Sequence, residues 1–157
     1  MNRNLILCTA LLLTGTALAQ APAMNTPSPA AVAAAANAAS VPAAGAEVYL
    51  IAPADGATVS GPVTVRFGLK GMGIAPAGIR FDNTGHHHLL VDTDIAELKL
   101  DESLPASEHV LHFGKGQTET TLTLAPGRHT LQLLFADFAH RSFEPALKSA
   151  KITITVK

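Results

Sequence analysis

Two stretches of the chain alternate apolar and polar residues in the way that half-buried β-strands do. Residues 62–67 read Pro-Val-Thr-Val-Arg-Phe, and residues 151–156 read Lys-Ile-Thr-Ile-Thr-Val. A period of two places successive side chains on opposite faces of a strand. Two further segments, residues 48–51 and 86–91, are also expected to be strands. Glycine, proline, asparagine and aspartate separate these runs, which is typical of turns.

The clearest turn lies between the runs at residues 118–124 and 129–135, which flank Ala-Pro-Gly-Arg. Proline followed by glycine suits the centre of a type II turn, because glycine readily takes a positive φ. We therefore expect an antiparallel hairpin in which Leu122 faces the core. The core-facing residues of its second strand would then be His129, Leu131, Leu133 and Phe135.

The number and spacing of these runs define the fold class. About six short strands within about 110 residues, divided by turns, predict an all-β domain. We expect a small antiparallel β-sandwich of immunoglobulin-like type over residues 46–157, with a small barrel as the alternative. One possible helical turn around residues 95–98 is the only departure from strand and loop.

The first 19 residues match a secretory signal peptide. Arg3 provides a positive start, residues 5–13 form a short apolar run, and an Ala-Leu-Ala cleavage motif ends at Ala19. This apolar run is shorter than the roughly 20 residues that span a bilayer. We therefore expect residues 1–19 to be removed, leaving no transmembrane anchor in a periplasmic or secreted protein.

Residues 20–45 have a different composition from the rest of the chain. They consist mostly of alanine, proline, serine, asparagine and threonine, with no charged or aromatic side chain. Such a segment buries too little apolar surface to offset the loss of chain entropy. We expect an Ala/Pro-rich disordered linker that tethers the β-domain.

Composition also narrows the chemistry of the mature chain. The only cysteine, Cys8, lies in the expected signal peptide, so neither a disulfide nor a thiolate ligand remains. The net charge of the full chain is −1 and the lysines are scattered, which argues against nucleic acid as a partner. All seven histidines, by contrast, fall between His86 and His140.

The adjacent residues His86, His87 and His88 are the central candidate site. On a strand, His86 and His88 share one face, and His87 points to the other. Two imidazoles on one face can bind a single ion when further ligands arrive from elsewhere, and neutral imidazole suits copper and zinc. We predict the metal ligands to be His86, His88, His112 and His140. The carboxylate alternatives are Asp92, Glu108 and Asp137.

The other histidines, His87, His109 and His129, are expected to be structural. Met72, between two glycines, is expected to fill a gap in the packing. The chain contains no His-Glu-x-x-His motif and no Gly-x-Ser-x-Gly motif. We therefore assign no catalytic residue and no organic cofactor, and we expect a binding protein in preference to an enzyme.

Several sequence blocks resemble a bacterial family of exported proteins, the domain-of-unknown-function family 4399. The blocks are Asn-Thr-Gly-His-His-His-Leu-Leu-Val-Asp at residues 83–92, His-Phe-Gly-Lys-Gly-Gln-Thr-Glu at 112–119, Pro-Gly-Arg-His-Thr-Leu-Gln-Leu at 126–133, and shorter ones at 53–57 and 65–72. The resemblance covers nearly all of residues 47–157 and implies export and a compact domain, without an established activity. In the family, further histidine and proline follow the position matching His140, whereas Arg-Ser-Phe-Glu-Pro follows here.

Three functions remain open at this stage. The first is an exported β-domain that binds copper or zinc through its histidines. The second is a metal-free module that contacts a cell-envelope protein through its tethered domain. The third is a metal-dependent enzyme with an open coordination position. Because protons compete with a metal for imidazole, we expect metal binding to weaken between about pH 7 and pH 5.

Overall fold

The computed structural model describes Ser28 and residues 40–157. The expected signal peptide and most of the expected linker therefore lie outside the described residues. Of the expected linker, Ser28 and residues 40–45 are described, and Ser40 contacts the β-domain. The carbonyl oxygen of Ser40 accepts a hydrogen bond from the backbone N–H of Glu144 at 2.8 Å. Within the described part of the chain, no helix is both long and apolar enough to cross a membrane.

Strands make up nearly all of the regular structure of the described residues, together with one short 3₁₀ helix. In chain order the elements are β1 (Glu47–Ala52), β2 (Thr58–Val59), β3 (Val63–Lys70), β4 (Gly73–Ile74), β5 (Thr84–Val91), the 3₁₀ helix η1 (Ile95–Glu97), β6 (Val110–His112), β7 (Glu119–Leu122), β8 (Gly127–Ala136) and β9 (Ile152–Val156).

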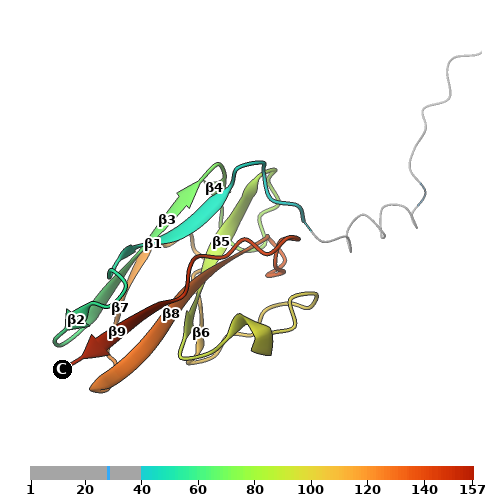
Figure 1. The fold of residues 1–157 in the computed structure, drawn as a ribbon. Helices are drawn as coiled ribbons and strands as arrows, with labels where there is room; N and C mark the ends of the chain where they lie inside the picture. Colours follow the sequence, from blue (N-terminus) through green and yellow to red (C-terminus); the bar gives the residue numbers. More distant parts are fainter. Residues whose placement is uncertain (1–27, 29–39) are drawn as a thin grey trace, which may run out of the picture. The chain divides into compact units, whose positions relative to one another are not determined.

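The strands form two sheets that pack as a sandwich. One sheet has the order β1-β3-β7, and the other has the order β2-β9-β8-β5-β4, with β6 also paired to β5. Figure 1 shows β1, β3 and β7 in one layer and β5, β8 and β9 in the other. The pairs are antiparallel except for β2 with β9 and β4 with β5. The all-β sandwich is therefore confirmed, and neither described sheet closes into the alternative barrel.

The alternation in the sequence correctly identifies the residues that face the space between the sheets. On β3, Val63, Val65 and Phe67 are buried, and the residues between them are exposed. From the other sheet, Leu131, Leu133 and Phe135 have no exposed surface. The predicted core face of residues 131–135 is thus confirmed. Removal of this apolar surface from water is the main stabilising contribution to such a domain.

The predicted hairpin around the Pro-Gly turn is wrong. β7 pairs with β3, with Val63 opposite Leu122, whereas β8 pairs with β5 and β9. The segment between β7 and β8 therefore crosses from one sheet to the other. Leu122 is half-buried and packs against the core from the opposite side to Leu131. A period of two in the sequence identifies which face of a strand is buried, but not which strand it pairs with. It therefore fits the predicted pairing of β7 with β8 and the observed pairing of β7 with β3 equally well.

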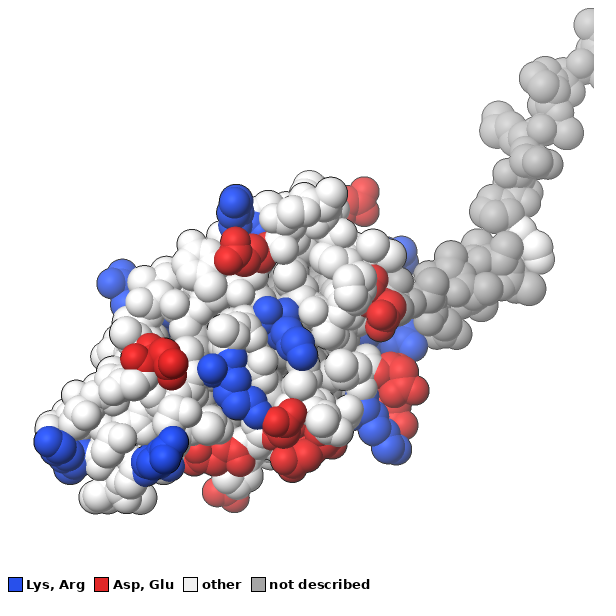
Figure 2. Space-filling view, in the orientation of Figure 1, with Lys and Arg blue, Asp and Glu red and all other residues white. Residues whose placement is uncertain are grey.

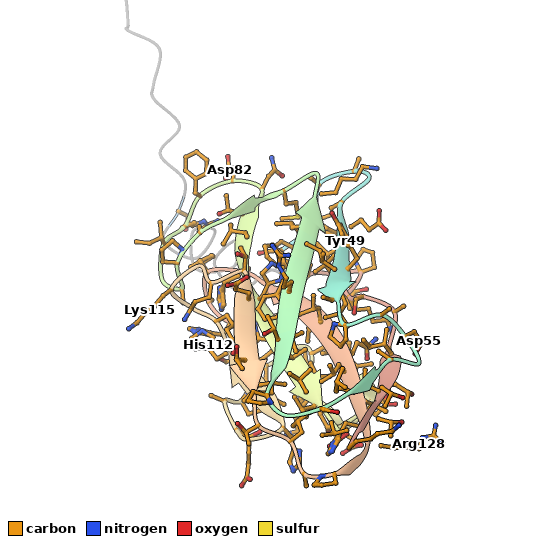
Figure 3. All side chains as sticks on the ribbon, turned by 90° about the vertical axis from the view of Figure 1, so that its left-hand side faces the viewer. Tyr49, Asp55, Asp82, His112, Lys115 and Arg128 are labelled. Atoms are coloured by element: carbon orange, nitrogen blue, oxygen red, sulfur yellow. The ribbon has the colours of Figure 1, made fainter. Side chains whose placement is uncertain are left out.

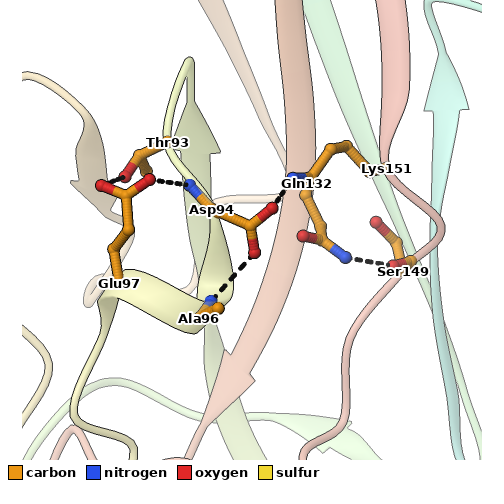
Figure 4. Close-up of polar contacts among 7 residues, drawn as sticks. All are labelled: Thr93, Asp94, Ala96, Glu97, Gln132, Ser149 and Lys151. Carbon is orange, nitrogen blue, oxygen red and sulfur yellow. Dashed lines mark hydrogen bonds and ion pairs between the residues drawn. The ribbon is translucent and has the colours of Figure 1, made fainter.

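A second, smaller apolar cluster lies on the outer face of the larger sheet. Its buried members are Leu90, Leu104, Leu134 and Ala136. Consequently β5 is buried on both faces for most of its length. The connection between β5 and β6 includes η1, where the predicted helical turn is found. Asp94 caps this turn by accepting the Ala96 N–H, and Glu97 accepts the Asp94 N–H in return (Figure 4).

Polar contacts join this connection and the segment before β9 to the rest of the domain. Lys151, one residue before β9, forms an ion pair with Asp94 (Figure 4). On β8, the side-chain amide of Gln132 donates a hydrogen bond to the Ser149 carbonyl at 2.8 Å. These contacts hold a layer of loops over the outer face of β5 and β8. On the face drawn in Figure 2, acidic and basic side chains are interspersed and do not form a patch of one sign.

Candidate functional site

Strand register brings three of the four predicted metal ligands together. His86 and His88 lie two residues apart on β5 and therefore point to the same face. β6 pairs antiparallel with β5, and its last residue, His112, is directly opposite His88. The His112 ring centroid is 5.0 Å from the centroids of both His86 and His88. In Figure 3, His112 lies at the margin of the fold, on the same side as Lys115.

The fourth predicted ligand, His140, arrives on a turn that follows β8. The last residue of β8, Ala136, is the cross-strand partner of His86, so the turn starts beside the histidine cluster. The Leu104 N–H donates to the His140 carbonyl at 2.8 Å, which joins this turn to the β5–β6 connection. The His140 ring centroid lies 5.0 Å from that of His86 and 4.7 Å from that of His112.

All four predicted histidines therefore lie in one cluster, which we call the histidine cluster. Its tightest part is His86, His112 and His140, whose ligand nitrogens lie within 4.8 Å of one another. The ring centroid of His88 is 5.0 Å from those of His86 and His112, and 6.2 Å from that of His140. His86 and His88 form the buried floor, whereas His140 is half-buried and His112 is exposed.

The buried imidazoles of the cluster have no hydrogen-bond partner among the described residues. Both ring nitrogens of His86 and both of His88 are inaccessible and unpaired. Leaving a buried polar group unsatisfied costs about 1–3 kcal/mol, so such groups are uncommon in folded proteins. A ligand that accepts the lone pair of each ring would reduce this cost.

The electrostatic environment keeps these rings uncharged at neutral pH. Burial, together with charge repulsion from the neighbouring His140 and His112, lowers the pKa of His86 to about 4. Burial and the adjacent histidines lower the pKa of His88 to about 3. The pKa of His112 is also lowered, mainly by burial and then by His140. Neutral imidazole is the form that binds metal ions.

The carboxylate alternatives do not contribute to the group of converging ligand atoms. Asp92 is hydrogen-bonded to the His129 ring at 2.6 Å and to the Thr130 N–H at 2.8 Å. Asp137 is hydrogen-bonded within the turn that carries His140. The converging donors are thus all imidazole nitrogens.

The three histidines predicted to be structural lie outside the cluster. His87 points between the two sheets, where its ring contacts Phe67 and Phe135 with centroid distances of 5.2 and 5.0 Å. It is fully buried, and burial lowers its pKa to about 4. His129 uses both ring nitrogens, one toward Asp92 and one toward the Ala125 carbonyl, and the pKa of His129 is raised by these contacts.

His109 and Met72, which were also expected to be structural, likewise have contacts outside the histidine cluster. The Nδ1 atom of His109 is 3.0 Å from the carbonyl oxygen of Val91. Met72 packs against the core between the sheets and is absent from the histidine cluster.

Gly114 is a member of the site that the sequence reasoning missed. A Cβ atom at this position would lie 2.3 Å from both Cε1 and Nε2 of His112. The His112 ring therefore occupies space that any other residue at position 114 would fill. The available signal was the spacing, because a glycine two residues after a strand histidine is placed to border its ring.

The fold and the site together define a small all-β sandwich domain with a histidine cluster on the outer face of one sheet. The family model described as "Domain of unknown function (DUF4399)" matches residues 65–157. The chain therefore belongs to this family, as the resemblance of its sequence blocks indicated.

Comparison with solved structures gives distant similarities. The endo-beta-1,4-mannanase from Thermotoga petrophila is similar with a TM-score of 0.41 and 19% identity, over 71% of this chain and 20% of that one. The fibronectin(III)-like modules of Clostridium thermocellum CbhA are similar with a TM-score of 0.33 and 13% identity, over 69% of this chain and 92% of that one. The present chain thus spans only a fifth of the length of the mannanase chain. No curated protein sequence matches it.

Proposed function

We propose that this protein binds one transition-metal ion, copper or zinc, through His86, His88, His112 and His140. The observation that carries the proposal is the convergence of four imidazoles from three separate segments of the chain. Two of these rings are buried with no hydrogen-bond partner among the described residues. A purely structural role would not require four imidazole rings to converge at one place.

The spacing of the rings supports a single ion. With metal–nitrogen bonds of about 2.0–2.1 Å, four imidazoles arranged tetrahedrally have ring centroids roughly 5 Å apart. In the histidine cluster, the separations between centroids are 4.7 to 5.0 Å for all pairs except His88 with His140. That pair is separated by 6.2 Å, so His88 and His140 are the rings that must approach most closely on binding.

The donor set favours particular metals. Imidazole nitrogen suits zinc and cupric ions, whereas calcium and magnesium prefer oxygen ligands. Thiolate and thioether donors favour cuprous ion, but among the described residues no cysteine joins the cluster and Met72 packs against the core between the sheets. Because His112 is exposed and His140 is half-buried, the ion would enter from the side that these two residues line.

The cellular role follows from this chemistry and from the amino-terminal sequence. We propose an exported protein that holds or carries the ion in the periplasm or outside the cell. The ion would also fix the position of the turn at residues 137–141, which we call the His140 turn, relative to β5 and β6. Catalysis at an open coordination position is not needed to account for the cluster.

Metal titration of the full chain tests this proposal. The protein is prepared without a histidine tag, stripped with chelator, and titrated calorimetrically with zinc and with cupric ion at pH 7.5. We expect one ion per chain. Changing a residue that only orients a ligand costs roughly 10–100-fold in affinity, so His86→Gln should cost at least as much. If neither metal binds, the metal-free interaction module becomes the better explanation. If His86→Gln binds metal as the wild type does, His86 is not a ligand and the site assignment is wrong.

A further inference from the structure

Asp137 is a buried acidic residue whose two carboxylate oxygens are both engaged. Its side chain is nearly inaccessible, with 4% of its surface exposed. Oδ1 accepts hydrogen bonds from the backbone N–H groups of Ala139 at 2.9 Å and Arg141 at 3.0 Å. Oδ2 accepts a hydrogen bond from the hydroxyl of Ser40 at 2.7 Å. The carboxylate therefore connects the two ends of the His140 turn to the amino-terminal segment.

The same turn holds His140 in an unusual backbone conformation. His140 has a φ of +63°, in the left-handed region that residues other than glycine rarely adopt. Its N–H donates to the Asp137 carbonyl at 3.0 Å, and the Asp137 N–H donates to the Arg141 carbonyl at 2.9 Å. Such a conformation persists only when surrounding contacts determine it. The Asp137 side chain supplies two of those contacts.

The position of Asp137 in the chain connects this turn to the histidine cluster. It directly follows Ala136, which is the cross-strand partner of His86 on β5. Ala136 also forms an isolated bridge to Ser142, on the other side of the turn. The bridge between Ala136 and Ser142 therefore closes the turn next to His86, and the turn places the His140 ring beside the His86 ring.

We infer that Asp137 is the positioning residue for His140, and that Ser40 assists by holding the second oxygen of its carboxylate. As far as metal affinity is concerned, the inference rests on the proposed function. Groups that orient metal ligands commonly change affinity about 10–100-fold when they are removed. Asp137 was a candidate ligand in the sequence, and here its role is to place a ligand instead.

Substitutions at Asp137 separate its hydrogen bonds from its charge. Asp137→Ala removes the three contacts of the side chain and should weaken zinc and cupric ion binding by about 10–100-fold. Asp137→Asn keeps an oxygen for the N–H groups and an amide group for the Ser40 hydroxyl, so it should weaken binding less. Ser40→Ala removes one contact and should also have the smaller effect. Asp82→Ala, at an exposed acidic residue outside these contacts, is the matched control and should have no effect.

A double-mutant cycle shows whether Asp137 acts through His140. In the His140→Gln background, Asp137→Ala should cause no further loss of affinity, because the ligand that it positions is already absent. The electron paramagnetic resonance spectrum of the cupric form should change in Asp137→Ala to that of His140→Gln. Equal losses in both backgrounds would show that Asp137 acts independently of His140 and would overturn the inference.

A measurement without metal keeps this inference separate from the proposed function. In the chelator-treated full chain, nuclear Overhauser effects should connect the rings of His140 and His112. In Asp137→Ala these effects should disappear, while those between His86 and His88 on β5 remain. If the His140–His112 effects persist in the variant, Asp137 does not position His140. If the wild type binds no metal but the effects disappear as expected, only the proposed function fails.

Discussion

His88 and His112 lie directly opposite each other on β5 and β6, with ring centroids 5.0 Å apart. Residues paired in this way in an antiparallel sheet have Cβ atoms about 4.5–5.5 Å apart, so their side chains meet on one face. A slip of one residue in the pairing would send the His112 ring to the opposite face. The register between β5 and the short strand β6 is therefore what assembles the histidine cluster.

Glutamine substitutions should divide the histidines into two groups. At pH 7.5, zinc or cupric ion should raise the melting temperature of the wild-type protein, because a ligand that is selective for the folded state stabilises it. His86→Gln combined with His88→Gln should remove most of this increase, as should His112→Gln combined with His140→Gln. Differential scanning calorimetry of the chelated and metal-loaded forms measures the increase for each variant.

His87→Gln is the matched control for these variants. It changes the adjacent residue on the same strand, but its ring lies between the sheets against Phe67 and Phe135. The variant should be less stable in the absence of metal, and yet it should keep the metal-induced increase. The assignment of the site fails if the increase is equally large in the His86/His88 double variant and in the wild type.

Gly114→Ala should weaken metal binding without unfolding the domain. The added Cβ would lie 2.3 Å from two atoms of the His112 ring, so the ring must move. Because His112 is exposed, it can swing toward solvent at little cost in stability. We expect the affinity of Gly114→Ala to approach that of His112→Gln in calorimetric titration. Wild-type affinity in Gly114→Ala would mean that His112 is not a ligand in its observed position.

The sequence carried enough information to predict the shared face of His86 and His88, because alternation along a single strand is a local property. It also identified Leu131, Leu133 and Phe135 as core residues for the same reason. Pairing between strands is not local, and for this reason the hairpin prediction failed. The Pro-Gly segment has the residues of a tight turn, but β7 and β8 instead bury their apolar faces from opposite sheets.

The convergence of His112 and His140 on His86 depended on two such non-local features. One is the pairing of β6 with β5, and the other is the turn after β8. The residue types suggested these ligands, but their spacing along the chain did not determine the distances. The role of Asp137 was hidden for a related reason. An acidic residue near histidines suggests a ligand, and its hydrogen bonds to the turn become visible only in three dimensions.

Leu133→Ala should strongly destabilise the domain. Leu133 has no exposed surface and belongs to the core between the sheets. Truncating a buried leucine to alanine costs about 2–5 kcal/mol, because apolar contacts are lost and a cavity remains. Urea unfolding of the metal-free protein measures this change. Ile51→Ala, at a residue with 54% of its surface exposed, is the control and should cost much less. Similar losses for the two variants would contradict the assignment of the core.

Acid should destabilise the metal-free protein, and His87 should account for part of the effect. Burial lowers the pKa of His87 from 6.5 to about 4 in the folded state. Between these two values the unfolded chain binds a proton that the folded chain does not, so stability falls as the pH decreases. Between pH 7 and pH 5 this one residue should contribute a loss of about 2 kcal/mol. The chelator-treated His87→Leu variant should lose that much less stability than the wild type over the same interval. Equal losses in the two proteins, measured by urea unfolding, would show that His87 titrates normally in the fold.

The pH dependence of metal binding should reflect the lowered pKa values of the buried ligands. With the ordinary pKa of about 6.5, protons would compete strongly with the metal between pH 7 and pH 5. The structure shifts this expectation to lower pH, because the pKa of His86 is about 4 and that of His88 is about 3. A ring with a lowered pKa stays neutral, and therefore able to bind metal, until the pH approaches that value. We expect the metal-induced increase in melting temperature to persist at pH 6 and to disappear as the pH falls toward 4.

This increase must be measured relative to the metal-free protein at each pH, because the raised pKa of His129 changes the stability of the metal-free protein in the opposite sense. Protonated His129 is stabilised by Asp92, so its contribution is present below about pH 6.5 and is lost as the pH rises through the folded-state pKa. If half of the metal-induced increase is already lost at pH 6.5, the lowered pKa values of His86 and His88 do not govern the competition between protons and the ion.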